Sequence, residues 1–180
     1  MTAQGVSWRI FLCVSVFLGG MLGCGGGVSS PQFPDGSKIT LFLYSDAGIR
    51  ENMPEAQKAD RKTLSEWMAT DTERRLKEGG FLIAKLDAQN NFKPAPHELM
   101  VVVTLDSFRA EDMLNQKELR LGEGVTHIQA AVELFKDNHT LPALRFTDGT
   151  STSREWTVGA GELTASLAAA VSDRVAELYR

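Results

Sequence analysis

The stretch "KITLFLYSD", residues 38–46, decides the fold that this sequence predicts. Successive side chains of a β-strand point to opposite faces of the sheet, so residues two apart share a face. Here both sets are largely apolar: Ile39, Leu41 and Leu43 on one side, and Thr40, Phe42 and Tyr44 on the other. This pattern predicts a strand that is buried on both faces or nearly so.

A helix and a second strand are expected to follow this strand. The helix is indicated by i, i+3, i+4 spacing of its buried positions, which are Leu64, Trp67, Met68, Thr72 and Leu76. Gly79 and Gly80 end it, and "FLIAKLD", residues 81–87, follows almost at once. Strand, helix and strand in so short a span predict a right-handed crossover that joins two parallel strands of one sheet.

The second half of the chain is typical of antiparallel strands. "ELMVVVTLDSF", residues 98–108, and "VTHIQAAVELFK", residues 125–136, are long strand candidates. The polar turn "KDNHT", residues 136–140, lets "LPALRFTDGTS", residues 141–151, return as an antiparallel partner. Pro142 is then expected at the start or on the edge of that strand.

The chain closes with a second predicted helix over residues 162–180, in which Leu163, Leu167, Val171 and Val175 follow helical spacing. The glycine pairs at 122–124 and 159–161 are interpreted as turn and cap residues. The expected fold is therefore α+β, a two-layer sandwich. A mixed sheet of about five strands, built as β-α-β and then an antiparallel meander, carries two helices packed on one face.

The N-terminus carries a targeting signal instead of a membrane span. The apolar run from Ile10 to Leu22 is shorter than the roughly 20 residues that a spanning helix needs. Arg9, the apolar core and the small residues after it are typical of a signal peptide, which we place at residues 1–23.

The residues Met21-Leu22-Gly23-Cys24 at the end of this core resemble the bacterial lipobox, with Met21 where that motif prefers leucine. The resemblance implies that Cys24 is diacylated and becomes the first residue of the mature chain. Cys13, the only other cysteine, is discarded with the signal, so Cys24 has no disulfide partner. Ordinary secretion, with cleavage near Gly23 and a free Cys24, is the alternative.

The division that follows is an acylated cysteine and flexible tether at 24–37, rich in glycine, serine and proline, and a single periplasmic domain at 38–180. In lipoproteins of diderm bacteria the residue after the cysteine resembles a sorting label, and aspartate there retains the protein in the inner membrane. This chain has Gly25. The resemblance implies attachment to the outer membrane, with the domain facing the periplasm, if the source is diderm.

The charge pattern argues against a nucleic-acid partner. The chain has 19 lysines and arginines against 23 aspartates and glutamates, a net charge of −4. Its basic residues are interleaved with acids, whereas phosphate binding needs a basic patch or stripe. A solvated surface of mixed charge is the better interpretation.

Candidate catalytic or metal-binding residues are few. His97, His127 and His139 show none of the spacings of a zinc site, so no metal and no cofactor are expected. His97 and His139 are interpreted as solvated turn residues, and His127 as part of a polar stripe with Gln129 and Glu133. No serine stands in a nucleophile elbow, and the sequence predicts no enzyme.

The segment 107–124 is too long for an ordinary hairpin loop of 2–5 residues. It carries four apolar residues among charges, Met113, Leu114, Leu119 and Leu121. They are interpreted as a satellite core, as an extension of the flanking strands, or as a surface that docks a partner.

The element order behind a lipobox, together with "LRLGEGVTHIQAAVELFKDNHT", residues 119–140, resembles a family of bacterial envelope lipoproteins of unknown function. More distantly, the architecture is similar to that of envelope lipoproteins involved in secretion and assembly. The leading hypothesis is a lipid-anchored envelope protein with a non-catalytic role in binding or assembling with another envelope protein. A periplasmic module that binds a small ligand between helices and sheet is the alternative.

Overall fold

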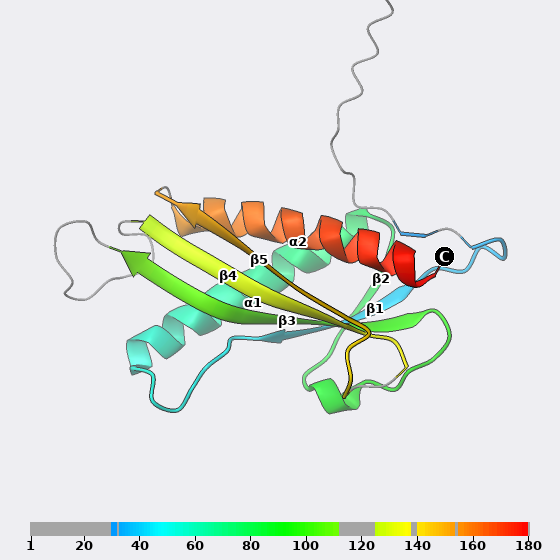
Figure 1. The fold of residues 1–180 in the computed structure, drawn as a ribbon, viewed down its shortest axis with the longest axis horizontal. Helices are drawn as coiled ribbons and strands as arrows, with labels where there is room; N and C mark the ends of the chain where they lie inside the picture. Colours follow the sequence, from blue (N-terminus) through cyan, green and yellow to red (C-terminus); the bar gives the residue numbers. More distant parts are fainter. Residues whose placement is uncertain (1–29, 32, 112–124, 138–139, 154, 180) are drawn as a thin grey trace, which may run out of the picture.

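The computed structural model describes residues 30–31, 33–111, 125–137, 140–153 and 155–179. Five strands form one mixed sheet in the order β2-β1-β3-β4-β5, and two long helices pack on it (Figure 1). The elements are β1 (Thr40–Asp46), α1 (Glu55–Glu78), β2 (Leu82–Lys85), the short 3₁₀ turn η1 (Gln89–Asn91), β3 (Glu98–Glu111), β4 (Val125–Phe135), β5 (Leu144–Thr152) and α2 (Trp156–Leu178). The predicted α+β class is confirmed.

The β-α-β unit is built as predicted. β1 pairs with β2 in parallel, with Leu41 opposite Ile83, and α1 forms the crossover between them. On its other side β1 also pairs in parallel with β3, so that Leu41 lies opposite Leu99 as well. β1 therefore lies inside the sheet, which explains why both of its faces are largely apolar.

The second half of the sheet is the predicted antiparallel meander. β3 pairs with β4, and β4 pairs with β5, with Val132 opposite both Val103 and Phe146. The register shifts once, between Leu105 and Ser107 of β3. Pro142 lies two residues before Leu144, the first residue of β5, where its missing N–H costs the sheet no hydrogen bond.

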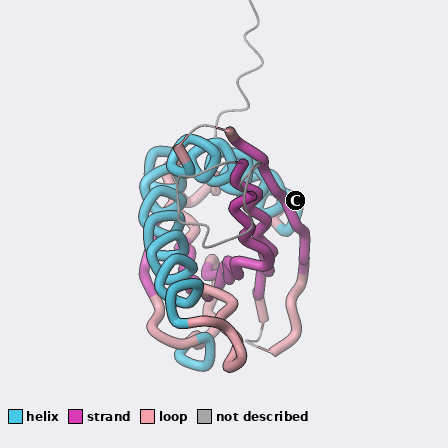
Figure 2. Tube along the Cα trace, turned by 90° about the vertical axis from the view of Figure 1, so that its left-hand side faces the viewer, coloured by secondary structure: helices cyan, strands magenta, loops and turns pink. Residues whose placement is uncertain are grey.

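Both helices cover the same face of the sheet, and Figure 2 shows them together on one side of the strands. α1 contacts β1, β2 and β3, whereas α2 contacts β4 and β5. The core between them takes the inward residues of every strand and four predicted positions of α1, Leu64, Met68, Thr72 and Leu76. Trp67, expected in that buried face, is only half-buried and packs edge-to-face on Trp156 at 5.7 Å between ring centroids.

The interpretation of Gly159 and Gly161 as turn or cap residues is wrong, because α2 begins at Trp156 and includes both. A Cβ on Gly159 would lie 2.6 Å from Thr152 Cγ2 of β5, closer than carbon atoms approach. The glycine lets α2 begin this early and still lie against β5. Close packing against a strand, which sequence spacing does not report, overrides the low helix propensity of glycine.

The opposite face of the sheet is covered only in part. Phe92, Met100, Val102 and Phe135 form a second, smaller buried cluster there, with Phe42 and Tyr44 of β1 packed against it. Phe92 follows η1, so the connection from β2 to β3 folds over this end of the sheet. The same connection supplies one wall of the pocket described below.

Candidate functional site

An open pocket with a volume of about 390 Å³ lies at one end of the sheet. It is lined by Pro94, Ala95, Pro96, His97, Lys136, Asp137 and Tyr179. Because β3 and β4 are antiparallel, the start of β3 and the end of β4 meet at one edge, where Met100 lies opposite Phe135. Tyr179, the residue directly after α2, lines the pocket from the side of the helices.

Three aromatic rings pack at this pocket. The ring centroid of Phe33 lies 4.3 Å from that of His97 and 5.4 Å from that of Tyr179, edge-on in both cases. The rings of His97 and Tyr179 are nearly parallel, with centroids 6.0 Å apart. These three residues, called the aromatic clamp below, come from the N-terminal segment, the start of β3 and the end of α2.

His97 lies in a turn, as interpreted, but it is half-buried instead of solvated. It is half-buried in the aromatic clamp, and its Nδ1 is buried without a hydrogen-bond partner among the described residues. Its backbone has a φ of 62°, the left-handed region that non-glycine residues rarely adopt. His97 follows Pro96 in a turn that is closed by a hydrogen bond from Glu98 N to the Ala95 carbonyl oxygen at 3.1 Å, and proline at that position is typical of turns with a positive φ at the next residue.

Lys136 and Tyr179 form the polar side of the pocket. Lys136 Nζ donates a hydrogen bond to the Leu178 carbonyl oxygen at 3.0 Å and lies 4.6 Å from the centroid of the Tyr179 ring. A cation suits both the last turn of a helix and the face of an aromatic ring. Burial raises the pKa of the Tyr179 phenol above its usual value, and the negative charges of Asp137 and Glu98 add to this shift.

Binding is the chemistry that this arrangement offers. The pocket has an apolar wall of two prolines and an alanine, an aromatic face, one ammonium group and one carboxylate. Within the described ranges, no three histidine, cysteine, aspartate or glutamate side chains come close enough to hold a metal ion. In that same part of the chain, no helix is both long enough and apolar enough to cross a membrane.

His127 lies on the face of β4 away from the helices, as its interpretation as part of a polar stripe predicted. Its Nδ1 is 2.6 Å from Ser151 Oγ on β5. Along the same face, Gln129 is exposed, and Glu133 accepts a hydrogen bond from Arg145 Nε at 2.7 Å. These contacts are the cross-strand pairs expected on the solvated face of an antiparallel sheet.

Several predicted site residues lie outside the described residues: Cys24, Gly25, Met113, Leu114, Leu119, Leu121 and His139. The structure shortens the connection that the sequence predicts over residues 107–124. β3 continues to Glu111, and β4 begins at Val125. Residues 107–111 therefore extend the flanking strand, one of the three interpretations of this segment.

A buried arginine was missed in the sequence. Arg61 of α1 is 3% exposed, and its Nε donates to the Ala47 carbonyl oxygen at 2.8 Å. Its Nη2 donates to the carbonyl oxygens of Leu105 and Asp106, where the register of β3 shifts. Burial, and then the like charge of Arg50, lower the pKa of Arg61. The sequence did contain a pattern that indicates burial of Arg61, because this residue continues the i, i+3, i+7 series of Leu64 and Met68.

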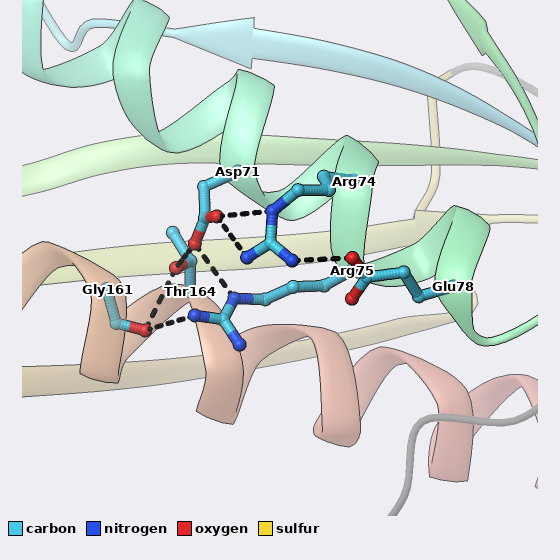
Figure 3. A network of polar contacts seen from close by, with 6 residues as sticks. All are labelled: Asp71, Arg74, Arg75, Glu78, Gly161 and Thr164. Atoms are coloured by element: carbon cyan, nitrogen blue, oxygen red, sulfur yellow. Dashed lines mark hydrogen bonds and ion pairs between the residues drawn. The ribbon is translucent and has the colours of Figure 1, made fainter.

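A polar network between the helices was also missed (Figure 3). Asp71 of α1 accepts hydrogen bonds from Arg75 Nε at 2.8 Å and from Arg74 Nη2 at 2.6 Å, and its Oδ2 lies 2.5 Å from Thr164 Oγ1 of α2. Arg75 also donates to the Gly161 carbonyl oxygen at 3.1 Å. The network links α1 to α2. Because its members hydrogen-bond to one another, we interpret it as stabilising the packing of the two helices and not as a binding site.

Comparison with known proteins finds likeness in fold only. No family model matches the sequence, and neither does any curated protein. Among solved structures, a variant of the PelC dodecamer from Paraburkholderia phytofirmans is 14% identical with a TM-score of 0.41, over 78% of this chain and 92% of that one.

Two further solved structures are similar to a comparable extent. A Xanthomonas campestris protein of the DUF330 family is 13% identical with a TM-score of 0.38, over 82% of this chain and 86% of that one. A minor lipoprotein from Acinetobacter baumannii is 12% identical with a TM-score of 0.36, over 83% and 96%. The fold thus resembles, distantly, those of PelC and of a minor lipoprotein, and no argument about activity follows from it.

Proposed function

We propose that this protein is a lipid-anchored protein of the bacterial cell envelope whose domain binds or assembles with another envelope protein. The observation that carries the proposal is Gly23-Cys24 at the end of an apolar run too short to span a bilayer. Each buried CH₂ of an acyl chain stabilises membrane attachment by about 0.8 kcal/mol, so two or more long chains hold a protein firmly.

Metabolic labelling with a palmitate analogue tests the anchor. Wild-type protein should take up the label, and Cys24→Ser should leave an unlabelled precursor or a mis-cut product. Cys13→Ser is the matched control, because it removes a thiol from the discarded signal and should leave labelling unchanged. Equal labelling of wild type and Cys24→Ser would refute acylation at this residue.

The membrane in which the anchor sits follows from Gly25. If the source is diderm, wild-type protein should band with the outer membrane on a density gradient, and Gly25→Asp should move it to the inner membrane. Wild-type protein found with the inner membrane would show that Gly25 does not determine the destination.

The proposed binding role draws support from the edge of the sheet. Among the described strands, β5 has a neighbour on one side only, so its other side is an edge of the described sheet. Edge strands of this length are the usual sites at which a partner adds a strand. β5 is nine residues long and therefore offers a longer edge than the four residues of β2.

Crosslinking of the acylated protein in membranes tests this role. A reproducible envelope protein should be captured, and Thr147→Lys should reduce its capture, because lysine on an edge strand opposes pairing. Thr147 is exposed on β5, and Thr63→Lys adds the same charge at an exposed position of α1. Equal loss in both variants, or recovery of wild-type protein without a partner, would contradict the assignment.

Binding of a small ligand is a second candidate function, favoured by the pocket of about 390 Å³. Ala95→Trp should fill this pocket from an exposed position, whereas Ala143→Trp places the same ring at an exposed position that does not line it. Small molecules extracted from the envelope should raise the melting temperature of the wild type and of the second variant only. Equal shifts in all three proteins would exclude the pocket.

A further inference from the structure

The structure describes where the chain joins the domain after the predicted tether. The backbone N–H of Ser30 donates to the Gly79 carbonyl oxygen at 2.7 Å, just after the end of α1. Gly80, with a φ of +91°, lies so close that a Cβ there would be 3.1 Å from Ser30 Oγ. Part of the segment predicted as tether is thus in contact with the domain.

The aromatic clamp provides the second point of attachment. Phe33 is half-buried and packs against His97 and Tyr179, and the turn after it is closed by a hydrogen bond from Gly36 N to the Phe33 carbonyl oxygen at 2.9 Å. Tyr179 stands one residue before the end of the chain. The start of the described chain and its C-terminal end therefore meet at one end of the domain, on the right in Figure 1. His97 and Tyr179 also line the pocket, which places it at the same end.

The number of residues between anchor and domain limits how far this end can move from a membrane. Six peptide units separate Cys24 from Ser30, and a fully extended chain rises at most about 3.5 Å per residue, which gives a reach of roughly 20 Å. α1 alone, with 24 residues at about 1.5 Å each, is roughly 36 Å long. The reach is shorter than the helix that leads away from the point of attachment.

We infer that the end of the domain that carries the aromatic clamp and the pocket faces the bilayer, and that the N-terminus of α1 points away from it. The inference rests on the proposed function, because it takes Cys24 as the anchored residue. It also places the open pocket next to lipid headgroups, so that a ligand of the pocket would be met at the membrane surface. Because the aromatic clamp attaches the N-terminal segment to one end of the domain, an anchor at Cys24 holds that end near the membrane.

Energy transfer from a dye on the protein to headgroup-labelled lipid measures this orientation. Acylated protein in vesicles is labelled at Glu78→Cys or at Glu55→Cys, at opposite ends of α1, where both native side chains are largely exposed. Cys24 does not react with the dye because its thiol is acylated. Transfer should be several-fold more efficient from position 78 than from position 55. Equal transfer, or more from position 55, would overturn the inference.

The variant Phe33→Ala tests the cause. Without the ring, the hydrogen bond of Ser30 to Gly79 is the contact that the described residues leave to hold this segment, and the next fully buried residue is Ile39. The reach then rises to roughly 50 Å for fifteen peptide units. The difference between the two positions should shrink, and an unchanged difference would show that the clamp does not set the orientation. Flotation with the vesicles, measured separately, tells whether the anchor itself has failed.

Discussion

At the scale of the residue, Arg61 shows how this fold accommodates a buried charge. Among the described residues, its guanidinium group donates to three backbone carbonyls, those of Ala47, Leu105 and Asp106. Those carbonyls belong to the loop after β1 and to the place where the register of β3 shifts. One side chain thus satisfies oxygens from two separate segments, which a shorter residue at this position would leave buried and unpaired.

The variant Arg61→Ala should lower the free energy of unfolding by about 3 kcal/mol, because hydrogen bonds to charged groups are strong and the carbonyls stay buried. Urea denaturation measures the loss. Lys62→Ala, one residue on and exposed, is the control and should change stability by less than about 0.5 kcal/mol. A midpoint for Arg61→Ala equal to that of the control would mean that water satisfies these carbonyls.

At the scale of the element, the two glycines of α2 have opposite roles. A Cβ on Gly159 would meet Thr152 Cγ2 at 2.6 Å, whereas a Cβ on Gly161 would lie 3.7 Å from Trp67, an ordinary contact distance. Both glycines lie in a helix, where alanine is the better residue by about 1 kcal/mol. Packing against β5 therefore determines the effect of adding a Cβ at Gly159, whereas helix propensity determines it at Gly161.

Gly159→Ala should consequently destabilise the protein by at least about 1 kcal/mol, because it overpacks the contact between α2 and β5. Gly161→Ala should stabilise it by about 0.5–1 kcal/mol through helix propensity. Thermal unfolding of the two variants side by side gives the comparison. The same sign of change in both would show that α2 can shift away from β5 at little cost.

The link between α1 and α2 depends on the charge of Asp71. Burial raises the pKa of this carboxyl, but hydrogen bonds from Thr164, Arg75 and Arg74 outweigh it and hold the pKa below the usual value of 3.8. A carboxyl with a lowered folded pKa stabilises the fold fully above its unfolded pKa of about 3.9. That contribution is lost as the pH falls through the lower, folded value.

Asp71→Asn should therefore cost about 1–2 kcal/mol at pH 7. The difference from wild type should shrink as the pH falls below about 4, where the wild type loses the same interaction. Glu78→Gln, at the exposed end of the network, should have little effect at either pH. A penalty for Asp71→Asn that persists unchanged at low pH would mean that shape, and not charge, links the helices.

At the scale of the whole molecule, Phe33 near the start of the domain and Tyr179 near its end meet beside the pocket, where they pack in the same cluster as His97. The sheet has β2 at one edge and β5 at the other, yet the segments that begin and end the domain lie side by side. This closure holds Tyr179 half-buried against Lys136, so its phenol reports whether the ends remain together.

The phenol of Tyr179 should ionise above its usual pKa of 10.0, since burial disfavours the phenolate. The protein has two tyrosines, so the tyrosinate absorbance of wild type minus that of Tyr179→Phe isolates this transition. Stability supplied by the neutral phenol is present below about pH 10 and is lost as the pH rises through the folded value, so Tyr179→Phe should resist alkali better. Phe33→Ala should return the transition toward 10, and a wild-type transition at or below 10 would refute the closure.

The sequence by itself determined the class and order of the elements. β1 is revealed by a short run that is apolar on both faces, β4 by alternation and α1 by its i, i+3, i+4 series, because these local patterns reflect which side chains face the core. The same reasoning predicted the parallel crossover and the meander, and it placed His127 on the polar face of the sheet. The lipobox is also local, but the anchor at Cys24 remains a prediction.

Only the tertiary structure decided which distant residues meet. The early start of α2 depends on Thr152, and the burial of Arg61 depends on carbonyls 44 and 45 residues away. The partial burial of the His97 ring depends on Phe33 and Tyr179, which lie near the two ends of the domain. The pocket joins a connection, a strand end and a helix end that share no sequence pattern. Periodicity reports the face on which a side chain lies, whereas its partners on that face are set by how the layers pack.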